Sequence, residues 1–180
     1  MRIKERLLKR SEHTRPGRKK RETTGIVLHW TGNPNAGAGS HRRYFNSLTD
    51  RYASYHYIID WDGTIVRLIP ENEIAWHAGP ANKTSETLVD RLGQYPNWRT
   101  VGIAMCHTDL DTIPPAVFDS AAELTADIAI RHGIPVRNIL RHYDCTGKTC
   151  PGPMAGEDNA DWARFLHSVR AFDDALERIA

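Results

Sequence analysis

The sequence predicts an α/β protein with a single domain, in which a central mixed β-sheet is flanked by helices. Short apolar runs rich in β-branched residues recur along the chain, and amphipathic helical patterns stand between and after them. An Asp-Gly turn joins two neighbouring runs, which adds an antiparallel hairpin to the sheet. The chain has 180 residues, 40% apolar and 26% charged, as expected for one globular unit with its own core.

The domain is predicted to begin with a buried strand and a helix. Residues 24–30 (TGIVLHW) are apolar and β-branched, which is typical of a short buried strand. The strand ends at residues 31–39 (TGNPNAGAG), a segment of turn-forming residues. Ser40 then stands in a position to cap a helix over residues 40–48.

A hairpin and a long connection are predicted next. Residues 55–59 and 64–68 are strand-like runs, and residues 60–63 (DWDG) between them contain the Asp-Gly pair of a hairpin turn. Residues 74–76 (IAW) form a short extended piece. Residues 77–97 show little periodicity, and a connection of this length is more often functional than inert.

The second half supplies a strand and a long helix. Residues 101–106 form another buried strand, and the helix opens at Pro114 or Pro115 and ends at Gly133. One face of this helix is apolar and carries Val117, Ala121, Leu124, Ile128 and Ala129.

The last two predicted elements are a short strand over residues 139–142 and an amphipathic helix over residues 161–179. Strands interleaved with helices in this way indicate a sheet covered by helices. The last helix brings together the side chains of Trp162, Phe165, Leu166, Val169 and Phe172.

Charge divides the chain into a basic N-terminal arm, residues 1–21, and a main domain, residues 22–180. The arm carries ten Lys or Arg and two Glu, whereas the rest of the chain carries fourteen basic and twenty acidic residues. A Pro-Gly pair would interrupt any helix begun at Ile3, so residues 15–21 are interpreted as a linker. Such an arm attracts polyanions, for example an anionic envelope polymer, a lipid surface or nucleic acid. The alternative is a solvated terminus without a partner.

Composition also bears on the compartment and on the cysteines. The first ten residues are positively charged without an apolar stretch behind them, so we expect a chain made in the cytoplasm without a signal peptide. No apolar run approaches the roughly 18 residues that a membrane span needs. Three cysteines do not make a disulfide framework, and their small, odd number favours metal binding or free thiols.

His29 and residues 141–153 (RHYDCTGKTCPGP) offer ligands that a metal prefers. His29 ends a buried strand directly before a Gly-rich loop, where sites collect in α/β sheets. His142 stands at a predicted strand end, and Cys150 lies in a loop rich in Gly and Pro. Neutral imidazole and thiolate suit zinc, and three such ligands leave the fourth tetrahedral position for water, as in catalytic sites. A Cys145–Cys150 disulfide, or Cys145 as the ligand in place of Cys150, is the alternative.

Six other histidines are expected to have surface or packing roles. They lie in the arm, on predicted helices, or in or at the ends of other elements. His56 should face away from the tyrosines on either side of it in its strand and should be hydrogen-bonded. The residues in this group are His13, His41, His56, His107, His132 and His167.

Five segments in order give the chain a specific resemblance over roughly residues 22–175, which leaves out the basic arm. Together they resemble the N-acetylmuramoyl-L-alanine amidase family, which includes phage endolysins, bacterial muropeptide-recycling amidases and animal peptidoglycan-recognition proteins. The segments are residues 27–32 (VLHWTG), 54–64 (SYHYIIDWDGT), 75–79 (AWHAG), 100–105 (TVGIAM) and 141–151 (RHYDCTGKTCP).

The resemblance implies a metal site and two catalytic residues. It implies that His29, His142 and Cys150 bind one Zn²⁺ per chain, in agreement with the ligand types. Lys148 matches a catalytic lysine, whose ammonium would stabilise the oxyanion formed when water attacks the amide carbonyl. Tyr55 matches a catalytic tyrosine of the phage lysozyme-like branch, whose hydroxyl would orient the water or donate to the tetrahedral intermediate.

The resemblance also implies substrate contacts and shows one departure. His77 matches a position that lines the substrate cleft, and its neighbour Trp76 and Thr31 in the loop 31–39 are expected to bind substrate as well. Many members have a glutamate base in the strand matched by residues 100–105, where this chain has Ala104. The branch with a tyrosine at the Tyr55 position generally lacks this glutamate too.

The implied function is hydrolysis of the amide between N-acetylmuramic acid and the L-alanine of the peptidoglycan stem peptide. The basic arm favours a phage or prophage endolysin that acts on the cell wall after release, and a cytosolic muropeptide-recycling amidase is the alternative. A peptidoglycan-recognition module that only binds is a second alternative, disfavoured because such members typically lose the ligand at Cys150. We expect a monomer. We expect no specific nucleic-acid partner, because the acidic domain does not continue the basic surface of the arm.

Overall fold

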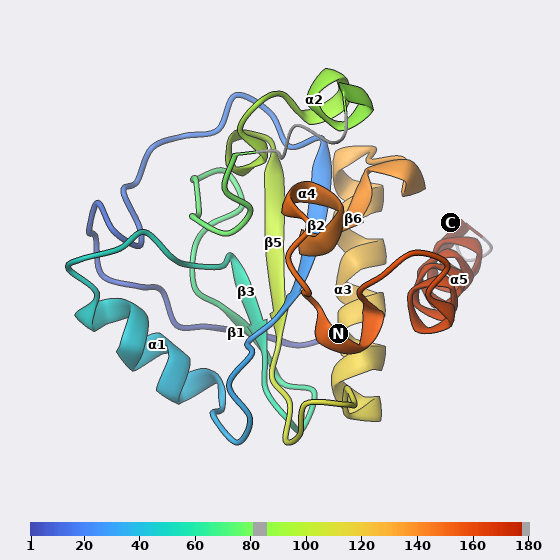
Figure 1. The fold of residues 1–180 in the computed structure, drawn as a ribbon, viewed down its shortest axis with the longest axis horizontal. Coiled ribbons are helices and arrows are strands. Elements are labelled where there is room, and N and C mark those ends of the chain that lie inside the picture. The colour runs from blue at the N-terminus through green and yellow to red at the C-terminus, as the bar shows by residue number, and fades with distance from the viewer. Residues whose placement is uncertain (81–85, 178–180) are drawn as a thin grey trace.

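A six-stranded mixed sheet forms the centre of the molecule in the computed structural model, which describes residues 1–80 and 86–177 (Figure 1). The strand order is β1-β4-β3-β5-β2-β6, and of the neighbouring pairs only β3 and β4 are antiparallel. The predicted hairpin and mixed sheet are thereby confirmed. The strands are β1 Ile3–Glu5, β2 Gly25–Trp30, β3 Tyr57–Ile59, β4 Ile65–Arg67, β5 Thr100–Met105 and β6 Ile139–Arg141.

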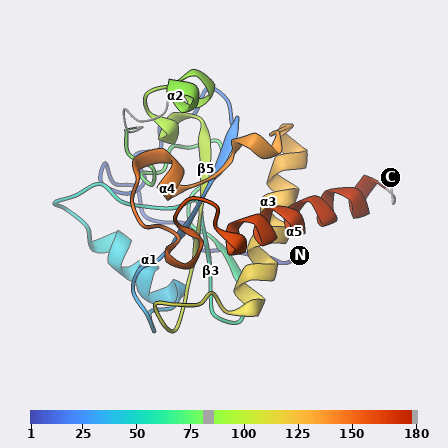
Figure 2. The same ribbon diagram turned by 45° about the vertical axis from the view of Figure 1, so that its right-hand side comes forward.

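Helices cover both faces of the sheet. The two long helices α3 and α5 cross each other on the side away from α1, as the turned view shows (Figure 2). The helices are α1 Ala38–Ser47, α2 Glu86–Leu92, α3 Pro115–His132, α4 His142–Thr146 and α5 Ala160–Glu177, with short 3-10 turns at Pro96–Trp98, Val136–Asn138 and Gly152–Met154.

Alternation along β2 explains how one strand serves two cores. Ile26 and Leu28 point into the large cluster under α3 and α5, whereas Val27 packs on the opposite face near α2 and α4. His29 has the parity of Val27 and therefore shares the face that carries α1 and α4. Since β2 is central and paired on both sides with parallel strands, its apolar residues are fully buried.

Several local expectations are confirmed and others are wrong. The long helix α3 ends at Gly133, which has a left-handed φ of 62°, as predicted. Ser40 lies inside α1, whose N-cap is Gly37, so the predicted Ser40 cap is wrong. No helix begins at Ile3, because this residue opens β1 instead. The helix predicted over residues 161–179 corresponds to α5, and its last two positions, 178 and 179, lie outside the described residues.

The basic arm packs against the domain. Its β1 pairs in parallel with β4 at the edge of the sheet, and Leu8 is only 2% exposed. The Arg15 guanidinium donates to the Glu73 carboxylate at 2.9 and 3.1 Å, and the ammonium of Lys20 is buried. Residues 15–21 are thus held by tertiary contacts, and their interpretation as a linker is corrected. Among residues 1–80 and 86–177, none of the helices has the length and apolar character that crossing a membrane requires.

Candidate metal centre

His29, His142 and Cys150 converge at the carboxyl end of the central strands. Nδ1 of His29 lies 3.2 Å from Nδ1 of His142 and 3.8 Å from Sγ of Cys150, and the three ligand atoms lie within 4.8 Å of one another. His29 is the fifth residue of β2, and His142 follows β6 directly as the first residue of α4. Because β2 and β6 are parallel neighbours, their carboxyl ends place both imidazoles together.

The loop that carries Cys150 is fastened to the end of β6. The N–H of Tyr143 donates to the carbonyl of Cys150 at 2.9 Å. Arg141 is buried, and its guanidinium donates to the carbonyl oxygens of Met154 and Gly156, each at 2.7 Å. These bonds hold the loop beyond the cysteine, so the thiol is presented to the histidines by a rigid segment.

The electrostatics of the three residues suit a cation. Burial lowers the pKa of His29 well below its usual value, and burial and the Lys148 charge lower the pKa of His142 to about 4. Both imidazoles are therefore neutral at pH 7, as metal ligands must be. Burial raises the pKa of the Cys150 thiol to about 11, and a cation beside the sulfur reverses this preference in favour of the thiolate. Two neutral imidazoles and one buried sulfur fit zinc.

The other cysteines do not join this group. Cys145 is 1% exposed and packs among the apolar side chains of Val27, Leu88 and Leu140. All three cysteines of the chain are free thiols in the structure. Of the alternatives left open by the sequence, the structure therefore contains neither the Cys145–Cys150 disulfide nor Cys145 beside the histidines.

The two residues expected to be catalytic lie next to the trio. The Tyr55 ring centroid is 5.0 Å from that of His29 and 5.6 Å from that of Phe45 on α1. Burial and the neighbouring Cys150 raise the pKa of the Tyr55 hydroxyl, so it keeps its proton at neutral pH. Lys148 is exposed and its charge lowers the pKa of both His29 and His142.

A cavity of about 400 Å³ adjoins Tyr55. Thr31 and Tyr55 line it together with His41 of α1 and Arg51. Among the described residues, Oγ1 of Thr31 and Nε2 of His41 are buried without a hydrogen-bond partner. His41 was expected to have a surface or packing role. In the structure it is buried on the same face of α1 as Ala38 and Phe45, as its helical spacing with them indicates.

Residues 19–153 match the family model described as N-acetylmuramoyl-L-alanine amidase. The chain belongs to the N-acetylmuramoyl-L-alanine amidase family. It is 35% identical over 175 residues to a probable N-acetylmuramoyl-L-alanine amidase of Bacillus licheniformis, which covers 96% of this chain and 46% of that protein. It is 29% identical over 124 residues to the 1,6-anhydro-N-acetylmuramyl-L-alanine amidase AmpD of Citrobacter freundii, covering 68% of this chain and 60% of AmpD.

Solved structures of the same class share the fold. The catalytic domain of XlyA superposes with a TM-score of 0.73 at 25% sequence identity, covering 94% of this chain and 99% of that domain. The curated amidase from Bacillus licheniformis is about twice as long as the matched region, since the chain spans only 46% of it. The family match begins at residue 19, so β1 and Leu8 lie outside it while still packing on the sheet.

His77 lies against His29 and does not line the cavity beside Tyr55. It is 6% exposed, with Nδ1 3.1 Å from Nε2 of His29 and Nε2 3.3 Å from Oγ1 of Thr100. Oδ1 of Asn97 accepts from the backbone N–H groups of His77 and Ala78. The substrate contact of His77 stays a prediction, and the contact that the structure contains is with His29.

Trp76 also points away from the cavity. Its indole N–H donates to the carbonyl of Glu12 in the basic arm at 2.8 Å, and its ring meets that of Tyr52 edge-on at 5.5 Å. The substrate role of Trp76 stays a prediction, and in the structure the side chain packs against the arm. Of the three residues expected to bind substrate, Thr31 alone lines the cavity beside Tyr55.

Ala104 stands where many members of the amidase family carry a glutamate. It is the register partner of His29 across β2 and β5 and is fully buried. Paired residues of neighbouring strands present their side chains on the same face, so a carboxylate at this position would lie beside His29. The methyl group of Ala104 instead packs with Ile58 and Phe45, and the face next to His29 is apolar there.

The remaining histidines mostly pack as expected. His56 accepts from the N–H of Gly102 at 2.9 Å and lies opposite Tyr57, which belongs to the core under α3. The expected alternation fails for Tyr55, because this residue precedes β3 and packs beside His29. His107 stacks on the Trp30 indole with centroids 4.3 Å apart.

Proposed function

We propose that the chain is a zinc-dependent N-acetylmuramoyl-L-alanine amidase. It hydrolyses the amide between N-acetylmuramic acid and the L-alanine of the peptidoglycan stem peptide, with one Zn²⁺ held by His29, His142 and Cys150. The observation that carries the proposal is the convergence of these three ligands beside Tyr55 and the cavity that Tyr55 lines. The similarity to proteins named as amidases of this bond supports it.

The metal site, Lys148 and Tyr55 each contribute to hydrolysis of the amide. Zinc in such a site supplies a Lewis acid that polarises the amide carbonyl and lowers the pKa of water from about 15.7 to about 7. Lys148 offers a positive charge at the mouth of the site for the oxygen on which negative charge develops. The Tyr55 hydroxyl keeps its proton and donates a hydrogen bond to that same oxygen. With Ala104 beside His29, Tyr55 and Lys148 are the assisting groups.

The cavity next to Tyr55 receives the substrate in this proposal. Thr31, Ser40 and His41 line the cavity with polar side chains, which match the hydroxyl and amide groups of a muropeptide. Arg51 at the cavity holds a positive charge that suits a stem-peptide carboxylate. Both features favour a ligand that is polar and anionic.

Among cell-wall amidases, we propose an endolysin that acts as a monomer on the wall after release. The basic arm keeps exposed positive charges, including Arg2, Lys4 and Lys9. These charges would attract an anionic envelope polymer or lipid. The alternative is a recycling amidase, and a relative, AmpD, is named for 1,6-anhydro-N-acetylmuramyl substrates. Cys150 beside both histidines favours a hydrolase over a module that only binds peptidoglycan.

The deciding experiment incubates the purified chain with peptidoglycan, with and without a chelator, and identifies the new termini. New L-alanine amino groups that appear only with metal support the proposal, whereas new reducing sugar ends refute it. Intact sacculi and soluble 1,6-anhydro-muropeptides are assayed in parallel. Faster cleavage of sacculi supports the endolysin, and cleavage of the soluble fragments alone supports the recycling enzyme.

A further inference from the structure

Thr100, at the start of β5, has its hydroxyl between two partners. Oγ1 lies 2.8 Å from the carbonyl oxygen of Pro96 and 3.3 Å from Nε2 of His77. A carbonyl oxygen can only accept, so the single hydroxyl proton of Thr100 is directed to Pro96. The same oxygen can then only accept from His77, which requires a proton on Nε2 of that imidazole.

This constraint passes from His77 to His29. A neutral imidazole with its proton on Nε2 has a bare Nδ1, and Nδ1 of His77 lies 3.1 Å from Nε2 of His29. His29 must donate from Nε2, and its bare Nδ1 is the atom that faces His142 and Cys150.

We propose that His77 and Thr100 are positioning residues that form a hydrogen-bond relay of fixed direction, Pro96 carbonyl ← Thr100 ← His77 ← His29, which selects Nδ1 of His29 as the metal-ligating atom. The proposal rests on the metal centre of the proposed function. It goes beyond that function because it assigns a role to two residues that belong neither to the ligand trio nor to the lining of the cavity beside Tyr55. Partners of this kind fix the tautomer and the ring orientation of a ligating histidine.

The sheet is shaped to hold the relay. A Cβ on Gly102 of β5 would lie 2.6 Å from Cγ of His77, so the glycine makes room for the ring to lie flat on the strand. The ring of His56 meets that of His77 edge-on at 5.6 Å. His56 is itself fixed, because it accepts from the Gly102 N–H and donates from Nε2 to the carbonyl of Glu73 at 2.9 Å. The side chain of His77 is therefore confined on two sides.

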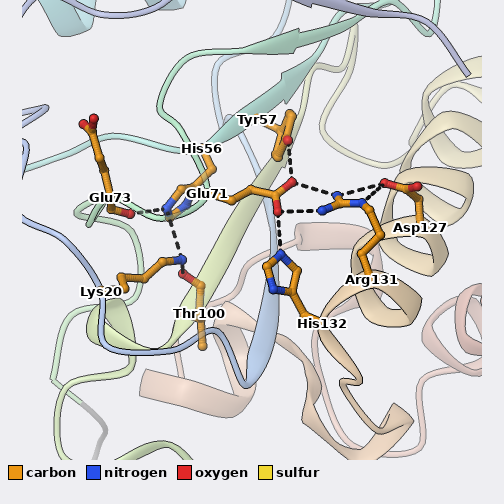
Figure 3. Close-up of polar contacts among 9 residues, drawn as sticks. All are labelled: Lys20, His56, Tyr57, Glu71, Glu73, Thr100, Asp127, Arg131 and His132. Carbon is orange, nitrogen blue, oxygen red and sulfur yellow. Dashed lines mark hydrogen bonds and ion pairs between the residues drawn. The ribbon is translucent and has the colours of Figure 1, made fainter.

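Lys20 of the basic arm lies next to His56 and Thr100, two of the residues that neighbour His77. Figure 3 shows its ammonium beside His56 and Thr100, and the ammonium donates to the Thr100 carbonyl at 2.8 Å. Lys20 lies within the residues matched by the family model, and its contact with the Thr100 carbonyl fixes the backbone of the residue whose hydroxyl takes part in the relay.

The tautomers test the relay directly in the unmodified chain. Long-range ¹H–¹⁵N correlation spectra are recorded on the zinc-loaded, ¹⁵N-histidine-labelled chain and on the metal-free chain, and the His77 signals are assigned with the His77→Gln variant. The relay predicts protons on Nε2 of His77 and of His29, with His29 Nδ1 shifted by zinc. A proton on Nδ1 of His77 in either sample, or zinc on Nε2 of His29, overturns it.

A pair of variants at one position separates the hydroxyl from its packing. Thr100→Val keeps the β-branched shape and removes the hydroxyl, whereas Thr100→Ser keeps the hydroxyl. Zinc affinity is measured by competition with a chromophoric chelator. We expect Thr100→Val to bind zinc about 10-fold more weakly, the lower end of the 10–100-fold effects of outer partners, and Thr100→Ser to bind within about 2-fold of the parent. Equal affinity in all three proteins, or an equal loss in both variants, overturns the relay.

These readouts do not involve peptidoglycan. A chain that binds zinc with the expected tautomers but fails to release L-alanine termini retains the relay and loses the proposed amidase function. A chain that cleaves peptidoglycan but shows the wrong tautomers retains the function and loses the relay.

Discussion

Nδ1 of His29 and Nδ1 of His142 lie 3.2 Å apart, although 113 positions separate the two residues in the chain. Two bare nitrogen lone pairs at this distance repel each other, and a cation between them removes the repulsion. The parallel pairing of β2 with β6 produces this contact, because both strands end at the same edge of the sheet.

Cys150→Ser is expected to abolish tight zinc binding. The variant loses a soft ligand, so its zinc affinity should fall by more than the roughly 10–100-fold caused by outer partners. Metal content after dialysis and amidase activity measure the effect. Cys145→Ser is the matched control, because that thiol packs in an apolar cluster away from the histidines and its loss should leave zinc bound. Stoichiometric zinc in Cys150→Ser would contradict the assigned ligand set.

Tyr55→Phe is expected to lower turnover while zinc stays bound. The substitution removes only the hydroxyl that donates to the developing charge, and losing one such donor typically costs about 10²–10³ in kcat. Tyr44→Phe is the control, since Tyr44 lines the same cavity and is 40% exposed. Steady-state kinetics on a soluble muropeptide separate kcat from KM. An unchanged kcat would remove Tyr55 from the catalytic machinery.

Zinc affinity is expected to rise with pH by about tenfold per pH unit around neutrality. The Cys150 thiol has a pKa near 11 in the metal-free chain, so zinc must displace its proton at pH 7. Below about pH 4, protonation of His142 should steepen the dependence further. Competition titrations at several pH values, corrected for protonation of the chelator, give the slope. A flat profile would mean that the thiol does not bind the metal.

Glu71→Gln is expected to destabilise the fold by about 1–3 kcal/mol at pH 7. Burial raises the Glu71 pKa, but hydrogen bonds from Arg131, Tyr57 and His132 outweigh it and hold the pKa at about 2 (Figure 3). A depressed folded pKa stabilises the protein above the unfolded value near 4.5, and this contribution is lost as pH falls through about 2.

Chemical denaturation between pH 2 and pH 7 measures the Glu71 effect. Glu5→Gln is the control, because Glu5 pairs with Arg67 on the surface, where a salt bridge contributes about 0–1 kcal/mol. Equal losses in the two variants would contradict the special role of the buried carboxylate.

Lys20→Met is expected to change how stability depends on pH. Burial lowers the Lys20 pKa to about 7, so between pH 7 and 9 the unfolded chain binds a proton at this residue that the folded chain has released. The parent should therefore gain stability relative to Lys20→Met as pH rises through this window. Parallel denaturation curves of the two proteins at pH 7, 8 and 9 measure the difference. A constant difference would mean that Lys20 stays charged in the folded state.

Local patterns in the sequence determined the α/β class, the hairpin, the long helix ending at Gly133 and the two strands whose ends carry His29 and His142. Strand and helix periodicity and glycine conformation are properties of neighbouring residues, so they can be inferred without the fold. The choice of His142 and Cys150 as candidate ligands likewise rested on residue types within one segment.

Tertiary structure alone decided which polar residues face the site. His77 lies behind His29 because Asn97 and Gly102 hold it against β5, and the sequence around His77 carries no trace of those partners. The same holds for Lys20, whose charge looks like part of a solvated arm until the pairing of the arm with the sheet buries it. Burial and hydrogen-bond partners depend on residues far apart in the chain, and only the folded sheet brings these together.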